Sequence, residues 1–345
     1  MTSLLWQKTF LDLFPVPEFL LLSTVGVAVT DIDTKFVQLR REIFGDGFKL
    51  MSSSRMSNPT GAVESGLISQ PDELAGVLKI LFSRYNVRYA HAVLPEEKTY
   101  LFTTTIGSVP PEGLKDAAAF IIEENVPVTL TDSVFDFEII KVSEDTGDIK
   151  LAVSVVPKNV VDAYIKFFES AGVTPVSFDL ESRAMARAVI RPEDKRSHLI
   201  INLSLKKTGF YIVEDGVVQF STTPAYGVGQ DQSYSSLNDL KTEMRKVMTF
   251  WNAHTDPLHP SSGEAGQSGK PEGQIEKIIL CGSGASSGDF VEKLMGGGEV
   301  PYELANVWLN MSPSRSRVSE IPTDESLDYA SVIGLVLPGR KKLYV

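Results

Sequence analysis

The pentapeptide Gly284-Ala285-Ser286-Ser287-Gly288 has the G-x-S-x-G spacing that presents a nucleophilic serine on a sharp turn between a strand and a helix. The apolar run Ile275–Cys281 precedes it closely, as that motif requires. In the fold that uses the motif, however, the histidine of the triad follows the serine along the chain. All four histidines precede Ser286, namely His91, His198, His254 and His259. The chain order therefore argues against a serine hydrolase.

The histidines do not have metal-ligand spacing either. His254 and His259 lie with Asp256 in or beside the Pro-, Gly- and Ser-rich segment Thr255–Gln274, with no cysteine nearby, so we interpret them as part of a solvated loop and expect no metal site. His91 and His198 lie on apolar runs, where a hydrogen-bonded core or edge histidine is the usual interpretation. Neither G-x-x-x-x-G-K-[ST] nor G-x-G-x-x-G follows a strand, so a P-loop or a Rossmann site has no motif.

Length, charge and cysteine content limit the possible domain organisation, partners and cellular compartment. A chain of 345 residues exceeds the size at which one hydrophobic core keeps growing, so two domains are expected. The net charge of −11 disfavours nucleic acid and anionic lipid as direct partners, because both attract a basic surface. The single cysteine, Cys281, fits a reducing cytoplasm.

Two apolar segments near the N-terminus are candidates for contact with a membrane. The run Phe19–Val29 is too short to span a bilayer, so no transmembrane segment is expected. Leu4–Phe14 is amphipathic and is expected to form a helix packed on the body of the protein. A surface helix that contacts a membrane or a partner is the alternative.

A strand–turn–strand–turn–strand pattern occurs twice, roughly 170 residues apart. The first copy comprises the hairpin Gly26–Leu39, with a polar turn over Thr30–Thr34, and the strand Phe48–Met51. The second copy comprises His198–Leu203, Gly209–Val213 and Val217–Thr222. The repeat predicts two related lobes that face each other across a cleft.

Between the two copies the sequence predicts a compact α+β unit. Val87–Val93 is expected to form a hairpin with Thr99–Thr105, and Val134–Val142 another with Ile149–Val156. Met51–Gly66 is Ser-rich and is expected to be a surface loop. Helices are expected after Pro71, over Glu112–Asn125, around Val160–Phe168, over Leu180–Ile190 with Asp179 as N-cap, from Ser236, around Phe290–Met295 and over Leu327–Leu337.

The hairpin Gly26–Leu39 (GVAVTDIDTKFVQL) resembles the first phosphate-binding hairpin of actin-like proteins, and among these the pilus-assembly PilM proteins. Five more segments resemble PilM proteins in the same order: Gly61–Ile68, Phe120–Phe137, Ala171–Ala188, Leu280–Ala285 and Tyr329–Leu335. The resemblance implies an α/β, actin-like (ribonuclease H-like) fold, with two lobes of duplicated β-β-β-α-β-α order and an inserted small α+β subdomain.

The implied boundaries follow the resemblance along the chain. They are an amphipathic extension at 1–17, a first lobe at 18–87 and 158–195, an inserted subdomain at 88–157, a second lobe at 196–230 and 275–345, and a helical insertion with a flexible loop at 231–274.

In such proteins two Asp-containing turns hold the Mg²⁺-bound phosphates of ATP, and each turn needs Gly so that backbone N–H groups can approach phosphate. Here the Asp and Gly positions of the first turn are Ala28 and Thr30, and the second turn has Asn202-Leu203-Ser204 for Asp-x-Gly. Ser283 also replaces a glycine of the adenosine loop. These changes predict that ATP hydrolysis is lost, with no catalytic residue and no required cofactor. The alternative is a nucleotide-binding actin-like ATPase of pilus biogenesis in which Asp31 and Asp33 bind Mg²⁺.

The resemblance also assigns a nucleotide cleft and a partner. The candidate cleft residues are Thr30, Asp31, Lys35, Asn202, Ser204, Lys206, Thr208, Glu243, Lys246, Gly282, Ser283, Gly284 and Ala285. PilM proteins are cytoplasmic components of the type IV pilus platform that bind the N-terminal peptide of the inner-membrane protein PilN, in a groove between the first lobe and the inserted subdomain. The resemblance therefore implies a scaffold at the cytoplasmic face of the inner membrane that contacts a PilN-like protein and other platform proteins. A component of a type II secretion platform is the alternative.

Overall fold

The computed structural model describes residues 24–41, 47–228, 234–253, 274–311 and 321–339. The expected helix at 4–14, the segment 255–273 and both His254 and His259 lie outside the described residues. No helix within the described ranges is long and apolar enough to cross a membrane.

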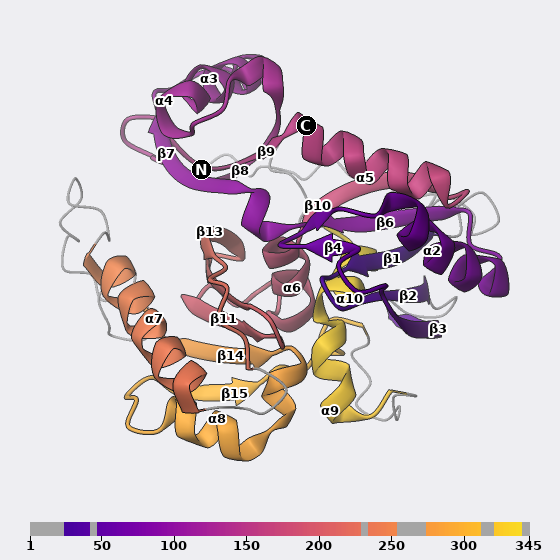
Figure 1. Ribbon diagram of the computed structural model, residues 1–345. Coiled ribbons are helices and arrows are strands. Elements are labelled where there is room, and N and C mark those ends of the chain that lie inside the picture. The colour runs from indigo at the N-terminus through magenta and orange to yellow at the C-terminus, as the bar shows by residue number, and fades with distance from the viewer. Residues whose placement is uncertain (1–23, 42–46, 229–233, 254–273, 312–320, 340–345) are drawn as a thin grey trace.

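Two five-stranded sheets of identical strand order form the two lobes (Figure 1). The first sheet has the order β10-β6-β1-β2-β3 and comprises β1 (Thr24–Val29), β2 (Asp33–Arg41), β3 (Phe48–Ser57), β6 (Tyr89–Leu94) and β10 (Thr174–Leu180). The second has the order β13-β12-β11-β14-β15 and comprises β11 (His198–Leu203), β12 (Thr208–Glu214), β13 (Val217–Thr222), β14 (Lys277–Cys281) and β15 (Tyr302–Leu304). Each begins with three antiparallel strands and adds two parallel ones, so the duplicated actin-like architecture is confirmed.

The helices that cross over between parallel strands also correspond. α2 (Pro71–Tyr85) connects β3 to β6, begins with Pro71 in its first turn and ends at Asn86, which has φ 51°. α7 (Tyr234–Ala253) connects β13 to β14, and it packs beside α8 (Gly288–Met295). This helix therefore occupies the place in the second lobe that α2 occupies in the first.

Two further helices cross between the lobes. α6 (Glu181–Val189) and α10 (Ala330–Val336) pack against each other in the middle of the molecule (Figure 1). Their close approach requires Gly334, because a Cβ at this position would overlap the carbonyl oxygen of Ala184. The expected N-cap of α6 is wrong: Asp179 belongs to β10, and its carboxylate pairs with Arg187 at 2.6 Å.

The inserted unit has a core of its own. Its sheet has the order β7-β9-β8, with β7 (Tyr100–Ile106), β8 (Ser133–Val142) and β9 (Ile149–Pro157). The short helices α3 (Leu114–Phe120) and α4 (Ile122–Asn125) cover one face of this sheet through buried Leu114, Ala118 and Ile122. Figure 1 shows this unit at the top of the molecule, with the helices at its outer end.

Two expectations about strands are wrong. Val87–Val93 and Thr99–Thr105 do not form a hairpin, because β6 pairs in parallel with β1 and β10 while β7 pairs with β9. The inserted sheet thus begins at Tyr100. Met51–Gly66 is only partly a loop, since β3 continues to Ser57 beside β2 and the short strands β4 (Val63–Glu64) and β5 (Leu67–Ile68) follow.

Candidate functional site

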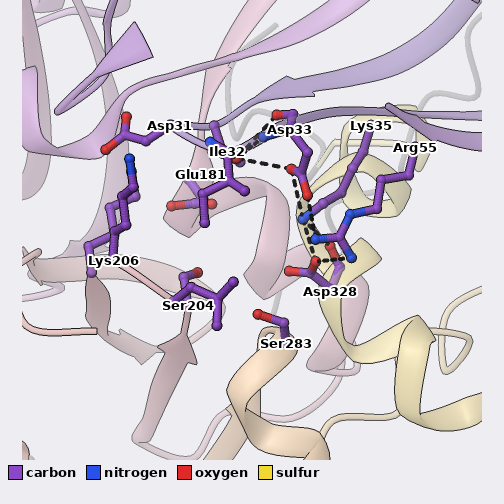
Figure 2. A pocket seen from close by; sticks show the side chains of 13 residues that line it. Asp31, Ile32, Asp33, Lys35, Arg55, Glu181, Ser204, Lys206, Ser283 and Asp328 are labelled. Atoms are coloured by element: carbon purple, nitrogen blue, oxygen red, sulfur yellow. Dashed lines mark hydrogen bonds and ion pairs between the residues drawn. The ribbon is translucent and has the colours of Figure 1, made fainter. Parts of the chain in front are cut away.

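A cleft of about 420 Å³, which includes space open to solvent, lies between the two lobes (Figure 2). Its lining residues are Thr30, Asp31, Ile32, Asp33, Lys35, Arg55, Glu181, Ser204, Leu205, Lys206, Lys207, Ser283 and Asp328. Six of the thirteen residues predicted from the sequence are among them: Thr30, Asp31, Lys35, Ser204, Lys206 and Ser283.

The first turn of the cleft satisfies its own backbone N–H groups. The Thr30 hydroxyl accepts hydrogen bonds from the amides of Ile32 (3.2 Å) and Asp33 (3.1 Å), and it donates to the Asp33 carboxylate (2.9 Å). The amide of Thr30 donates to the Asp33 carbonyl at 2.8 Å. In a glycine-containing turn such backbone amides can donate to a phosphate. In this protein the corresponding amides already donate to acceptors within the turn itself.

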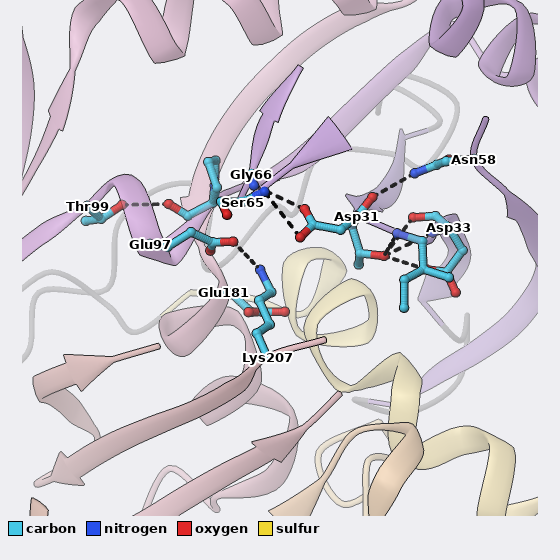
Figure 3. Close-up of polar contacts among 12 residues, drawn as sticks. Asp31, Asp33, Asn58, Ser65, Gly66, Glu97, Thr99, Glu181 and Lys207 are labelled. Carbon is cyan, nitrogen blue, oxygen red and sulfur yellow. Dashed lines mark hydrogen bonds and ion pairs between the residues drawn. The ribbon is translucent and has the colours of Figure 1, made fainter. Parts of the chain in front are cut away.

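Asp31 is held from the other side of the turn (Figure 3). Its carboxylate accepts the backbone N–H groups of Ser65 (3.2 Å) and Gly66 (3.1 Å), at the turn between β4 and β5. Figure 2 shows Lys206 of the second lobe pointing toward this carboxylate. These contacts engage both oxygen atoms of the Asp31 carboxylate with backbone donors.

Lys35, the cation expected to attract an anion, belongs to a buried ion-pair cluster. Its ammonium lies 2.6 Å from Asp328 and 3.5 Å from Asp33, and the Lys35 residue is only 5% exposed. Arg55 closes the cluster, at 2.5 Å from Asp33 and 3.3 Å from Asp328 (Figure 2). We refer to Asp33, Lys35, Arg55 and Asp328 as the four-residue ion cluster. Its two carboxylates balance its two cations, so it leaves no net positive charge for a phosphate.

The second turn of the cleft, which follows β11, also has its polar groups hydrogen-bonded within the protein. The amide of Ser204 donates to the Lys207 carbonyl (3.0 Å), and the Thr208 hydroxyl donates to the Tyr226 carbonyl (2.8 Å), so Thr208 is buried away from the cleft. Gly282 has φ 87°, and a Cβ there would overlap the Leu203 carbonyl and the Asn202 side chain. This glycine therefore allows two loops to pack closely.

A second, partly buried ion pair joins the lobes beside the cleft. The Lys207 ammonium lies 2.6 Å from the carboxylate of Glu97, which is in the short 3-10 helix η2 (Glu96–Lys98) between β6 and β7 (Figure 3). Burial lowers the pKa of Lys207, but the carboxylates of Glu181 and Glu97 raise it above its ordinary value overall. The ammonium is thus charged and paired with Glu97.

The remaining predicted residues lie outside the lining of the cleft. Glu243 and Lys246 pair with each other on α7 at 3.1 Å. Asn202, Gly282, Gly284 and Ala285 pack behind the cleft, and the Asn202 side-chain oxygen is buried without a hydrogen-bond partner. Sequence reasoning missed three charged lining residues, Arg55, Glu181 and Asp328, since each belongs to a different element and only the fold brings them together.

Within the described residues, no group of three or more His, Cys, Asp and Glu side chains is arranged to hold a metal. His91 bonds the Ser177 hydroxyl (2.7 Å) and His198 bonds the Arg196 carbonyl (2.7 Å). Burial lowers the pKa of both imidazoles below their ordinary value. Both histidines are therefore hydrogen-bonded strand residues.

Comparison with known proteins identifies relatives of this fold. The family model of the type IV pilus assembly protein PilM matches residues 26–244. No curated protein sequence matches the chain. A chain of a solved PilM–PilN type IV pilus biogenesis complex has a TM-score of 0.74 and 17% sequence identity, over 91% of this chain and 97% of that chain. That likeness shows the fold.

Two other solved structures are more distantly similar. The ethanolamine utilization protein EutJ from Carboxydothermus hydrogenoformans has a TM-score of 0.48 and 10% identity, over 90% of this chain and 88% of that chain. The cytoplasmic domain of EpsL, an inner membrane component of the type II secretion system of Vibrio cholerae, has a TM-score of 0.45 and 11% identity, over 89% and 93%.

Proposed function

This chain belongs to the PilM family of type IV pilus assembly proteins, and from this premise we propose that it is a scaffold of the pilus assembly platform. In this proposal it lies at the cytoplasmic face of the inner membrane and binds the N-terminal peptide of a PilN-like membrane protein. The observation that carries the proposal is the match of nearly the whole chain to the PilM fold of a PilM–PilN complex.

Two open strand edges support a peptide site between the first lobe and the inserted unit. β10 is an edge strand of the first sheet, and β8 is an edge strand of the inserted sheet. Arg183 of α6 lies between these elements and pairs with Asp136 (3.1 Å) and Glu138 (2.9 Å) of β8. Val176 on β10 is 44% exposed. An extended peptide can add to such an edge through main-chain hydrogen bonds and place its apolar side chains beside Val176.

We expect a synthetic peptide with the N-terminal sequence of a PilN-type protein from the same genome to bind in an isothermal titration. Val176→Arg should weaken binding at least tenfold, about 1.4 kcal/mol, because it replaces an apolar contact with a charged side chain. Ile80→Arg is the control, since Ile80 is 61% exposed on α2 and should not matter. Absence of binding at high micromolar peptide concentration would contradict the proposal.

We further propose that ATP hydrolysis is lost. The internally bonded turns, together with the pairing of Lys35 in the ion cluster and of Lys207 with Glu97, support this part of the proposal. The alternative, a nucleotide-binding ATPase, is favoured by the position of the cleft between the lobes and by Lys206, which lines the cleft and makes no ion pair among the described residues.

The two alternatives differ in a thermal shift. A ligand at about 100 times its Kd adds about 2.7 kcal/mol and raises the Tm of a protein of this size by several degrees. We expect millimolar MgATP to change the Tm by less than about 1 °C relative to MgCl₂ alone. A rise of several degrees that disappears when Mg²⁺ is chelated would instead support the nucleotide-binding alternative.

A further inference from the structure

The inserted unit presents an unusually exposed aromatic side chain at its outer end. Phe120, the last residue of α3, is 78% exposed, more than any other exposed large apolar side chain within the described ranges. It does not contribute to the core of the inserted unit, which Leu114, Ala118 and Ile122 fill from the opposite face of the helices. Burying an exposed phenylalanine is favourable, so this position is suited to a contact with another molecule.

The neighbours of Phe120 on the helix surface are acidic. α3 and α4 are interrupted only at Ile121, which keeps right-handed helical angles, so residues three and four positions away lie on the same face as Phe120. Three of these are carboxylates, Asp116, Glu123 and Glu124, and all three are exposed. Among the described residues neither Asp116 nor Glu124 makes an ion pair, whereas Glu123 accepts the amide of Leu130 at 3.1 Å. We call Asp116, Phe120, Glu123 and Glu124 the acidic aromatic face.

The charge of the chain is concentrated in the same unit. Residues 99–157 contain ten Asp or Glu, three Lys and no Arg, which gives −7 of the total −11. A field of this sign attracts cations and repels anions over a Debye length. This charge therefore favours a basic occupant at the acidic aromatic face.

This charge decides among the kinds of occupant. Anionic membranes and nucleic acids are repelled by it. A second copy docked through the same face would bring like carboxylates together, so a symmetric dimer is disfavoured. A basic protein segment fits both parts of the face, because an arginine guanidinium can stack on the Phe120 ring while it contacts the flanking carboxylates.

We propose that the acidic aromatic face is a docking site for an arginine-containing basic segment of a second partner protein. Figure 1 shows α3 and α4 at the far end of the inserted unit from the lobes, so this surface is separate from the strand edges β8 and β10. The chain then has two independent partner sites on two sides of one small subdomain.

The test uses fluorescently labelled hexa-arginine and hexa-lysine peptides, titrated with the full chain by fluorescence anisotropy at about 50 mM and about 200 mM salt. Phe120→Ala should weaken hexa-arginine binding about 2- to 5-fold and leave hexa-lysine nearly unchanged, since Arg stacks on aromatic rings more readily than Lys. Asp116→Asn with Glu124→Gln should weaken both peptides and reduce the dependence on salt.

Matched controls come from α2. Ile80→Ala and the pair Asp72→Asn with Glu73→Gln change an exposed apolar residue and two exposed carboxylates in the first lobe, and they should leave hexa-arginine binding unchanged. Equal effects of the α2 and α3 variants would overturn the proposal, because binding would then follow net charge alone. A loss of self-association caused by Phe120→Ala in sedimentation equilibrium would also overturn it, since the face would then join two copies of the chain. Neither result depends on whether a PilN-type peptide binds.

Discussion

Replacing Asp328 by alanine is expected to lower the free energy of unfolding by about 3–5 kcal/mol and the Tm by roughly 4–7 °C. Asp328 is the closest ion-pair partner of Lys35, at 2.6 Å, and its side chain is only 10% exposed. Without it, the Lys35 ammonium remains buried, and its only carboxylate in the cluster is Asp33 at 3.5 Å. A buried charge that loses its main partner costs far more than the pair contributes when intact.

The loss of the Asp328 carboxylate should affect both lobes, because Asp328 lies in a segment that contacts each of them. Asp328 lies in the 3-10 helix η6 (Leu327–Tyr329) directly before α10, whereas its partners Lys35 and Arg55 lie on β2 and β3 of the first lobe. The neighbouring Leu327 carbonyl accepts the amide of Gly282 from the second lobe at 2.9 Å. The ion cluster therefore fixes the segment through which the two lobes are joined.

Two further variants separate this explanation from a general effect of mutation. Lys35→Met with Asp328→Leu should recover most of the lost stability, because a buried ion pair can be replaced by apolar side chains at little cost. Asp289→Ala removes an exposed pair with Lys293 on α8 and should cost less than about 0.5 kcal/mol. If Asp328→Ala costs no more than Asp289→Ala in thermal unfolding, the cluster does not stabilise the junction.

The two lobes could be predicted from the sequence because each is built from local patterns. β11 is buried along its whole length, and the Asp215-Gly216 turn after β12 has the two positive φ angles that this pair of residues favours. The same reasoning failed for β6. Its apolar run predicts a strand but does not predict which strands pair with it in the sheet. The sequence cannot distinguish a hairpin with the next strand from parallel pairing with β1, which is far along the chain.

The cleft was only half predictable for the same reason. Thr30 and Ser204 occupy the glycine positions of the two family motifs, so the sequence shows that both turns are altered. The consequence is visible only in three dimensions, where the Thr30 hydroxyl bonds the amides of its own turn and Lys35 is paired from η6. Asp328 and Glu97 come from segments with no motif, and no sequence pattern indicates that they neutralise the cations of the cleft.

Stability is expected to fall as pH rises from about 4.5 to about 7, through the carboxyl group of Glu96. Burial raises the pKa of Glu96 from 4.5 to about 7, although hydrogen bonds from Ser182 favour its ionised form. The Ser182 amide (3.1 Å) and hydroxyl (2.8 Å) at the start of α6 both donate to this carboxylate. Because the folded protein holds the proton more tightly than the unfolded chain, the folded state is favoured at low pH and loses this contribution once Glu96 ionises.

The raised pKa of Glu96 sets the size of this loss of stability and suggests how to test it. A difference of this size in pKa corresponds to about 3 kcal/mol between pH 4.5 and pH 8 at 1.36 kcal/mol per unit. Glu96→Gln keeps an acceptor for Ser182 and carries no charge, so it should raise the Tm at pH 8 and leave it nearly unchanged at pH 5. The adjacent Glu97→Gln should instead lower the Tm at pH 8, because it removes the partner of Lys207.

A Glu96→Gln variant that shows the same loss of stability between pH 5 and pH 8 as the unmodified protein would assign the pH dependence to other groups. If the loss disappears, Glu96 is a buried acid at the point where β6 leaves the first lobe and the inserted unit begins.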